Sequence, residues 1–516
     1  MAHLRALDYL VIAVYLAGIM FIGLRMAGRQ KTTSEYFVAR HRIPTWALAF
    51  SLMATIISSV TFVAHPAAVF QRNFWLLMVN LAWPPILIVV AMVVVPFYRN
   101  VVGMSAYEYI GKRFGVGARV YSSLSFIINR IQDLGFTIYT TVIAVSVMSG
   151  WNIQAVILIF CVFTVIYTMI GGIEGVIWTD IVQGFVLVGG GLFVLYTALF
   201  GVSGGPAAIV STAWHAGKFG FGDFDFSWQS LYKDPATAWV LLAVGIIGVL
   251  RGYTADQSMV QRYLVARTDR SAKIGVFTGS LVCLPIWLMF AFIGACLWSF
   301  YNITGNVVPK EIMQRPDNIL PYFVVTQLPV GVVGMILAAI LAAAQSSISA
   351  DLNSVATVLT ADYFVQMRPQ SSDRARLLFG KLAVLASGMV CSAVALLLTL
   401  AKGKGALELG VILWMVVSSG VLGLFGLGFL TRSATRTGAY VGIAACVLFT
   451  AWGVVTGPLK VDLGFNYRMN SMLIGVWGQF VMFGAGYAAS RICGGYCPDL
   501  EGLTIWTRRA KSPGRS

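Results

Sequence analysis

An all-α protein with many membrane-spanning helices is the fold class that this sequence predicts. The chain has 516 residues, of which 58% are hydrophobic and only 11% are charged, whereas an ordinary soluble domain carries about 25% charged residues. Apolar runs of about 20 residues recur along the whole chain, and each could cross a ~30 Å hydrocarbon layer as a helix. These observations exclude a soluble globular enzyme and a disordered chain.

Thirteen segments are candidate membrane spans. They cover residues 7–24, 47–70, 75–97, 121–148, 156–171, 176–200, 237–255, 272–300, 328–362, 377–400, 407–430, 435–456 and 471–491. No small-residue cleavage site follows the first segment, so we interpret it as a retained helix and not as a signal peptide.

The Lys and Arg residues divide unequally between the two sides that these spans define. The connections after the odd-numbered spans, with the tail, hold 24 of them, and the opposite side holds 10. Because basic residues stay in the cytoplasm, the N-terminus is predicted outside and the C-terminus inside. The net charge of +16 is therefore read as a record of topology, and no nucleic-acid partner is expected.

Two of the predicted spans are rich in small residues and hydroxyl groups. One covers residues 51–61 and is followed by Pro66, which favours a break in the helix, and the other covers residues 342–354. A broken helix frees backbone carbonyls, and Ser or Thr hydroxyls can complete the oxygen shell that a hard cation such as sodium needs. The alternative is that these residues only pack helices together.

Charged residues inside spans are costly and mark candidate functional positions. Arg130 and Asp133 lie three residues apart on one helix face and can pair. They either orient the helix as a pair or contact a solute directly. The other such residues are Asp180, Arg251, Asp256 and Asp351. The chain has no clustered catalytic constellation and its four histidines are scattered, so neither an enzyme nor a metal centre is predicted.

Six motifs in order along the chain resemble those of the sodium:solute symporters, the family of sodium–glucose, proline, pantothenate and sialic acid carriers. They begin at Thr33-Ser-Glu-Tyr-Phe, Ser51-Leu-Met-Ala-Thr, Ser105-Ala-Tyr-Glu-Tyr, Gly171-Gly (through Trp178-Thr-Asp), Asp256-Gln (through Gln261-Arg-Tyr-Leu) and Ser346-Ser (through Leu352-Asn-Ser).

The resemblance implies a leucine-transporter-like core of two inverted five-helix repeats within a single transmembrane domain, residues 1–516. The parts of this domain would be an extra helix at 7–24, the repeats at 47–200 and 237–430, two further helices at 435–491 and a cytoplasmic tail at 492–516.

The family's main sodium site lies between the first and eighth core helices. Carried over by motif, the resemblance implies as ligands the carbonyls of Ala54, Ile57 and Ala343 and the hydroxyls of Ser346 and Ser347. A second sodium or proton site would use Asp180, Ser346 and Ser349. Ala350 stands where a further serine ligand is found in members that hold two sodium ions.

The resemblance also implies a solute site beside the sodium. Its residues would be Ser58, Thr61, Asn80, Arg130 and Asp133, with Tyr253 at the gate. Sialic acid carriers have an arginine at the Asp133 position. A carboxylate repels an anion and accepts hydrogen bonds from hydroxyls, so we expect a sugar or polyol. Arg130 keeps open the alternative of a carboxylate or amino-acid-like solute, such as sialic acid, proline, pantothenate or a monocarboxylate, coupled to sodium or to protons.

The function expected from the sequence is therefore sodium-driven symport by alternating access, with no enzymatic activity. Sodium would be co-transported. The expected partners are the solute, sodium and the lipid bilayer, without an obligate protein partner. The short connections between spans favour a bacterial inner membrane.

Overall fold

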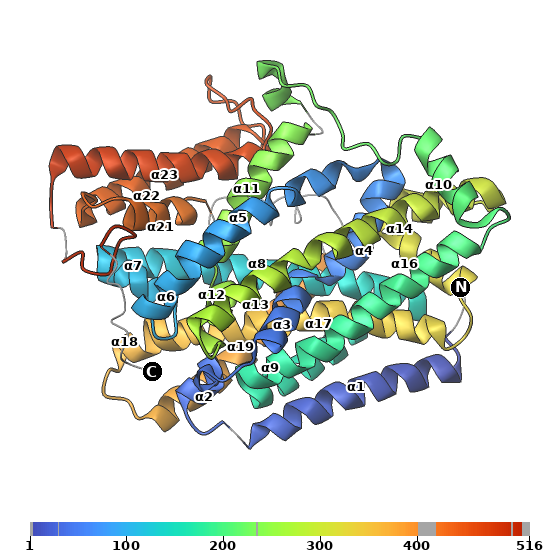
Figure 1. Ribbon diagram of the computed structural model, residues 1–516, viewed down its shortest axis with the longest axis horizontal. Helices are drawn as coiled ribbons and strands as arrows, with labels where there is room; N and C mark the ends of the chain where they lie inside the picture. Colours follow the sequence, from blue (N-terminus) through green and yellow to red (C-terminus); the bar gives the residue numbers. More distant parts are fainter. Residues whose placement is uncertain (1–3, 29, 234–235, 401–418, 497–498, 508–516) are drawn as a thin grey trace.

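The computed structural model describes residues 4–28, 30–233, 236–400, 419–496 and 499–507. In these ranges the secondary structure is helical, with no strand and one isolated bridge, between Ile43 and Ala266. The long helices lie side by side, many of them close to the long axis of the molecule (Figure 1). The prediction of an all-α protein is confirmed.

Ten helices of the described residues are long and apolar enough to cross a membrane, and one bent pair brings the number to eleven. The elements that build these spans are α1 (Ala6–Ala27), α3 (Thr45–Ile56), α4 (Ser59–Gln71), η2 (Phe74–Asn80), α5 (Trp83–Val89), η3 (Val90–Val94), α6 (Val95–Val101), α8 (Val116–Ser149), α9 (Ile153–Phe200), α11 (Ala238–Ala255), α13 (Asp269–Leu281), α14 (Cys283–Thr304), α17 (Val332–Val358), η6 (Leu359–Phe364), α18 (Val365–Met367), α19 (Asp373–Leu400), α22 (Arg436–Thr456) and α23 (Met472–Cys493).

Shorter elements connect these spans. They are α2 (Thr33–Val38), η1 (Ala39–His41), α7 (Tyr107–Phe114), α10 (Gly205–His215), η4 (Trp228–Tyr232), α12 (Gln257–Val265), α15 (Lys310–Gln314), η5 (Pro316–Asn318), α16 (Ile319–Gln327) and α21 (Val421–Leu430). The first half of the predicted span 407–430 lies outside the described residues, and its second half contains α21. Part of the predicted tail 492–516 also lies outside them.

Helix α9 contains two of the predicted spans, 156–171 and 176–200. Its 48 residues correspond to roughly 70 Å of helix, more than twice the thickness of the hydrocarbon layer. The backbone leaves the helical conformation at Gly172, where φ is 52° and ψ is −162°. This residue divides α9 into two crossings, so the structure agrees with two spans in this region.

The bent pair consists of α3 and α4, whose axes differ by 52°. The break falls at Ile57 and Ser58, which are extended, with ψ values of 98° and 177°. We expected Pro66 to favour the break, and this is wrong, because Pro66 lies inside α4. The interruption therefore begins three residues beyond Ala54, the last predicted carbonyl ligand on α3, and it includes Ile57, which is also a predicted ligand.

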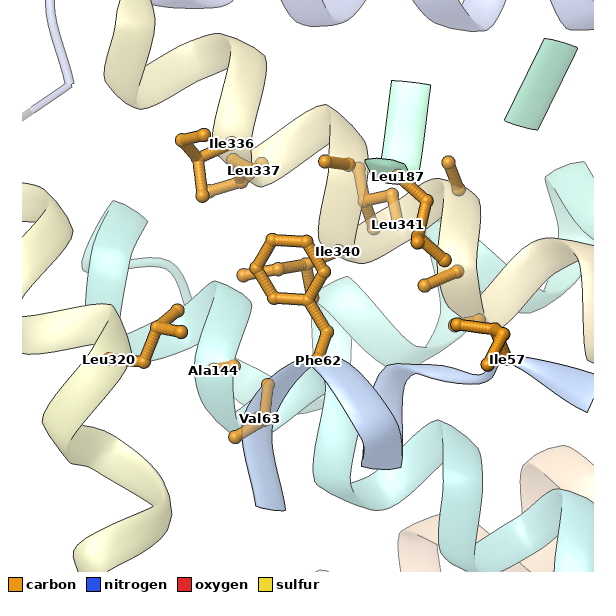
Figure 2. Packing of buried hydrophobic residues seen from close by; sticks show 14 of the residues in the cluster. Ile57, Phe62, Val63, Ala144, Leu187, Leu320, Ile336, Leu337, Ile340 and Leu341 are labelled. Atoms are coloured by element: carbon orange, nitrogen blue, oxygen red, sulfur yellow. The ribbon is translucent and has the colours of Figure 1, made fainter. Parts of the chain in front are cut away.

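Helix α17 is the buried centre of the bundle, and 89% of its most apolar window is inside the protein. Figure 2 shows the ring of Phe62 from α4 lying against Ile340 of α17, with Leu187 of α9 and Ala144 of α8 nearby. Phe62 also contacts Phe290 of α14, with ring centroids 4.7 Å apart. This apolar packing fixes the outer half of the broken helix against α17.

The connecting elements separate to two ends of the molecule. Figure 1 shows α2, α7 and α18 toward one end and α10 toward the other. The first group belongs to the connections that are rich in Lys and Arg, so this separation agrees with the charge pattern. We refer to the α10 end as the outer end and to the α2 end as the inner end.

We expect replacement of Gly172 by Ala to destabilise the protein. A Cβ atom there would lie 2.5 Å from Oε1 of Gln30 and 2.9 Å from Cδ2 of Tyr36, at a positive φ of 52°. A non-glycine residue in this region of φ/ψ space costs about 1–3 kcal/mol before any clash. The matched control is Gly189→Ala, where nothing lies within 4 Å. Equal thermal unfolding midpoints of the two variants in detergent would contradict the role of Gly172.

Candidate functional site

The break between α3 and α4 faces the middle of α17, and serine hydroxyls from α17 meet the carbonyls that the break exposes. The hydroxyl of Ser346 donates to the carbonyl of Ala54 at 2.8 Å and to that of Ala343 at 3.2 Å. The hydroxyl of Ser347 donates to the carbonyl of Thr55 at 3.0 Å. Both serines are buried. Uncharged oxygens from two helices therefore converge at one point.

This arrangement brings together Ala54, Ala343 and Ser346, three of the five residues predicted for the main sodium site, with Ser347 adjacent on α17. Ile57 lies at the break, where its N–H donates to the carbonyl of Met53 at 2.9 Å. The carbonyl next to Ser347 is that of Thr55, a residue that the sequence reasoning did not include. The donor set fits a hard cation, because carbonyls and a hydroxyl can all present lone pairs once the Ser346 proton turns away.

Asp180 lies in a different polar cluster from the one predicted. Its Oδ2 accepts hydrogen bonds from the hydroxyls of Ser51 at 2.6 Å and Thr55 at 3.5 Å, and the Nη2 atom of Arg262 lies at 3.3 Å. Neither side chain of the Asp180–Arg262 pair is exposed. Ser349 instead donates to the carbonyl of Ser346 at 3.2 Å. Asp180 is therefore paired with an arginine, which the sequence reasoning missed although it belongs to the Gln261-Arg-Tyr-Leu motif.

Arg130 is held by three carboxylates from three parts of the bundle. It pairs with Asp133 at 3.0 Å, as its spacing predicted, with Asp351 of α17 at 3.2 Å, and with Asp256 between α11 and α12. Arg251 is also within electrostatic range of Asp256 and Asp133. Of the three aspartates only Asp133 is substantially exposed, at 48% of its side chain, compared with 6% for each of the others.

This distribution of charge determines what the cluster can contact. The side chain of Arg130 is 16% exposed, and its guanidinium contacts three acidic partners. These ion pairs hold α8 against α17 and against the junction of α11 and α12. Asp133 is the group in the cluster that water or a solute can reach. The predicted pairing of Arg130 with Asp133 is observed, and the exposed carboxylate is the candidate contact; a solute contact of either residue stays a prediction.

The remaining predicted solute residues lie on the elements around the break. Ser58 precedes the first residue of α4 without capping it through its side chain, and Thr61 follows in the first turn of that helix. Asn80 is buried at the end of η2. Their hydroxyl and amide groups are of the kind that can form hydrogen bonds with a polar solute. The assignment of these residues to the solute site stays a prediction.

Tyr253, predicted at the gate, belongs to an aromatic cluster. Its hydroxyl donates to Ser280 of α13, and its ring contacts that of Trp83 edge-on with centroids 5.6 Å apart. Trp83 in turn contacts Trp287 at 4.7 Å. These rings join α5, α11 and α14 across the molecule, so movement of Tyr253 requires these three elements to separate locally.

Comparisons with known proteins agree with this arrangement. The family model described as "Sodium:solute symporter family" matches residues 36–445. The chain is 33% identical to the sodium/sialic acid symporter NanT of Aliivibrio fischeri over 448 residues, covering 86% of this chain and 87% of that protein. It is 33% identical to the sodium/sialic acid symporter SiaT of Proteus mirabilis over 462 residues, covering 89% and 91%.

A solved structure shares the fold. The substrate-bound outward-open state of a Na⁺-coupled sialic acid symporter matches with a TM-score of 0.87 at 31% identity, covering 95% of this chain and 98% of that chain. The leucine-transporter-like architecture predicted from the resemblance is confirmed by this similarity.

We expect Arg130→Gln to destabilise the protein far more than Asp133→Asn. Loss of the guanidinium leaves Asp256 and Asp351 buried without their shared cation, which costs about 3–5 kcal/mol. Asp133 is half exposed, so its neutralisation costs within about 1 kcal/mol. Thermal unfolding of the two purified variants beside the unmodified protein measures this. Equal destabilisation by both changes would contradict the charge assignment.

Proposed function

The chain belongs to the sodium:solute symporter family, and from this premise we propose that it imports a small carboxylate-bearing solute together with sodium by alternating access. The protein is a multi-pass membrane transporter coupled to sodium. The observation that carries the proposal is the contact of the Ser346 hydroxyl with the carbonyls of Ala54 and Ala343 at the helix break. The bacterial inner membrane is the location that we propose.

In this proposal sodium binds where these oxygens converge, between α3 and α17. Ala54, Ala343 and Ser346 supply three ligands, and Ser347 and Ile57 complete the set. The ion would join the two halves of the bundle, since α3 and α17 each provide oxygens. Its inward movement is favoured by ~2.3 kcal/mol per 100 mV of membrane potential.

The proposal includes one sodium ion. A second ion at Asp180, Ser346 and Ser349 would have to compete with Arg262, which already lies 3.3 Å from Asp180. Ala350 also lacks a ligand atom in its side chain. We therefore propose that Asp180 neutralises Arg262 and that this pair holds α12 against α3 and α9 while the inner side is closed.

The solute that we propose differs from the sugar or polyol that the sequence first favoured. Sugar transport is not supported, because the relatives with 33% identity are named as carriers of sialic acid. Their similarity favours the alternative reading, a carboxylate-bearing or amino-acid-like solute. Sialic acid, which carries both a carboxylate and several hydroxyls, is the first candidate.

The beginning of α4 supports a position for such a carboxylate. Ser58 makes no side-chain cap to the first amides of this 13-residue helix, so their N–H groups and the positive end of the helix dipole are available to an anion. Asp133 could then accept hydrogen bonds from the solute's hydroxyls, with Thr61 and Asn80 beside it. Repulsion between Asp133 and the solute is avoided because different ends of the solute face them.

We expect Ser346→Ala to raise the sodium concentration for half-maximal uptake by about 10- to 100-fold, since a hydrogen bond to a charged group contributes about 1.5–3 kcal/mol. The measurement is solute uptake into proteoliposomes at varied sodium. The matched control is Ser392→Ala, whose half-buried hydroxyl donates within its own helix to the carbonyl of Gly388. Unchanged sodium dependence in Ser346→Ala would remove the proposed ion site.

We expect the purified protein to take up radiolabelled sialic acid under an inward sodium gradient and to exclude neutral sugars and polyols. A second measurement that does not need transport is thermal unfolding: we expect sialic acid to raise the unfolding temperature of the purified protein only when sodium is present. Saturable uptake of a polyol with no response to sialic acid would overturn the proposed solute and leave sodium coupling intact.

A further inference from the structure

The outer end of α4 forms the wall between two hollows at the surface. The larger hollow has a volume of about 700 Å³ and lies against the ends of α4 and α14 and the segment of α15 and η5. The second, of about 670 Å³, lies against η2 and the connection that precedes α11. Arg72, the residue that follows α4, lines both. Cavities of this size are in the range that binds small molecules.

Arg72 has no acidic partner among the described residues. Its guanidinium lies 5.5 Å from the centre of the Trp75 ring, a contact that leaves its N–H groups free to donate. The two nearby acids, Asp223 and Asp225, are both engaged by Lys233, at 2.7 Å and 2.9 Å. Within the part of the chain that the structure describes, no acid therefore pairs with the cation in the wall of the hollow.

The carbonyls at the end of α4 do not require Arg72 either. The buried ammonium of Lys218 donates to Phe70 at 2.7 Å and to Val69 at 3.4 Å. It also lies 4.7 Å from the centre of the Trp298 ring. Since Lys218 satisfies the negative end of this helix, the guanidinium of Arg72 is left for a ligand.

The larger hollow has the chemistry that recognises a hydroxylated anion. Gln71, Asn302 and Asn306 provide carboxamides, and Trp298 and Tyr301 provide aromatic faces. The Nδ2 atom of Asn302 donates to the carbonyl of Trp298 at 2.8 Å, which orients the amide and leaves its oxygen to accept. A guanidinium can bind a carboxylate through two parallel hydrogen bonds, and the amides can bind hydroxyls.

We propose that this hollow is an outer subsite that binds the solute before it reaches the helix break. Arg72 binds the carboxylate, and Asn302 and Asn306 contact the hydroxyls. The 13 residues of α4 separate this subsite from Ser58 by roughly 20 Å, so it is a distinct position. A cation at the mouth also raises the encounter rate of an anion in a way that salt suppresses. The inference rests on the proposed function, because it takes the solute class from it.

The test compares sodium-driven sialic acid uptake by intact cells that express the full chain or a variant. We expect Arg72→Gln to raise the KM for sialic acid about 5- to 10-fold, with unchanged Vmax and unchanged half-maximal sodium. The KM of the unmodified protein should rise with ionic strength at constant sodium, and that of Arg72→Gln should not. Asn306→Ala, a change in a connecting segment, should raise the KM in the same direction.

The matched control is Arg468→Gln, another exposed basic residue on the side that the charge pattern assigns to the outside. It should leave the KM unchanged. The methyl ester of sialic acid, which lacks the charge, should inhibit the unmodified protein and Arg72→Gln with equal potency. Loss of Vmax in Arg72→Gln at constant KM would overturn the subsite, because it would place the residue in the transport step.

The two proposals fail in different ways. If the unmodified protein shows sodium-dependent uptake and both Arg72→Gln and Asn306→Ala keep its KM, the subsite is wrong and the proposed function stands. If the unmodified protein shows no sodium-dependent response to sialic acid in uptake or thermal unfolding, the proposed solute is wrong, and the subsite for it is wrong with it.

Discussion

The interruption of one helix inside the bilayer is the constraint on which the rest of this structure depends. In hydrocarbon every backbone polar group needs a partner within the protein or a water-filled cavity, and Ile57 and Ser58 leave the helical conformation in the middle of a predicted span. Ser346 and Ser347 supply hydroxyls to the carbonyls of Ala54 and Thr55. Helix α17 must therefore be adjacent to the break, and the apolar contact of Phe62 with Ile340 keeps it there.

The same bundle buries ion pairs whose members come from different parts of the chain. The Asp180–Arg262 pair joins α9 to α12, and Arg130 joins α8 to Asp256 and to Asp351 of α17. Buried pairs of this kind contribute little net stability, but breaking one leaves an expensive charge. They therefore favour a single arrangement of the helices that they join.

The polar chemistry of the chain is graded along the transport direction. Arg72 at the outer end has no acidic partner among the described residues. The helix break has uncharged oxygens, and the inner half has paired charges. In the proposed cycle an anionic solute is attracted first and then meets the groups proposed to bind sodium. Asp133 is the most exposed member of the charged cluster, at 48% of its side chain, and for this reason it is the member that we propose the solute contacts.

The sequence by itself determined the fold class and the residue types of the proposed ion site. It also located twelve of the thirteen predicted spans, all except the span 407–430, which is only partly described. Hydropathy and the asymmetry of Lys and Arg are properties of single segments, so they do not depend on how the helices pack against each other. The family motifs also predicted Ala54, Ala343 and Ser346 as neighbours. The pairing of Arg130 with Asp133 followed from helix geometry, because the two residues lie one turn apart.

Only the tertiary structure decided how distant segments combine. It placed the break at Ile57 and Ser58 although Pro66 carried the stronger local signal, and α4 continues through Pro66, its eighth residue. It paired Asp180 with Arg262, which lies 82 residues away in the sequence, and Asp351 with Arg130, which lies 221 residues away. It also left Arg72 without an acid between two hollows. Charge balance depends on distances across the bundle, and no pattern along one segment encodes them.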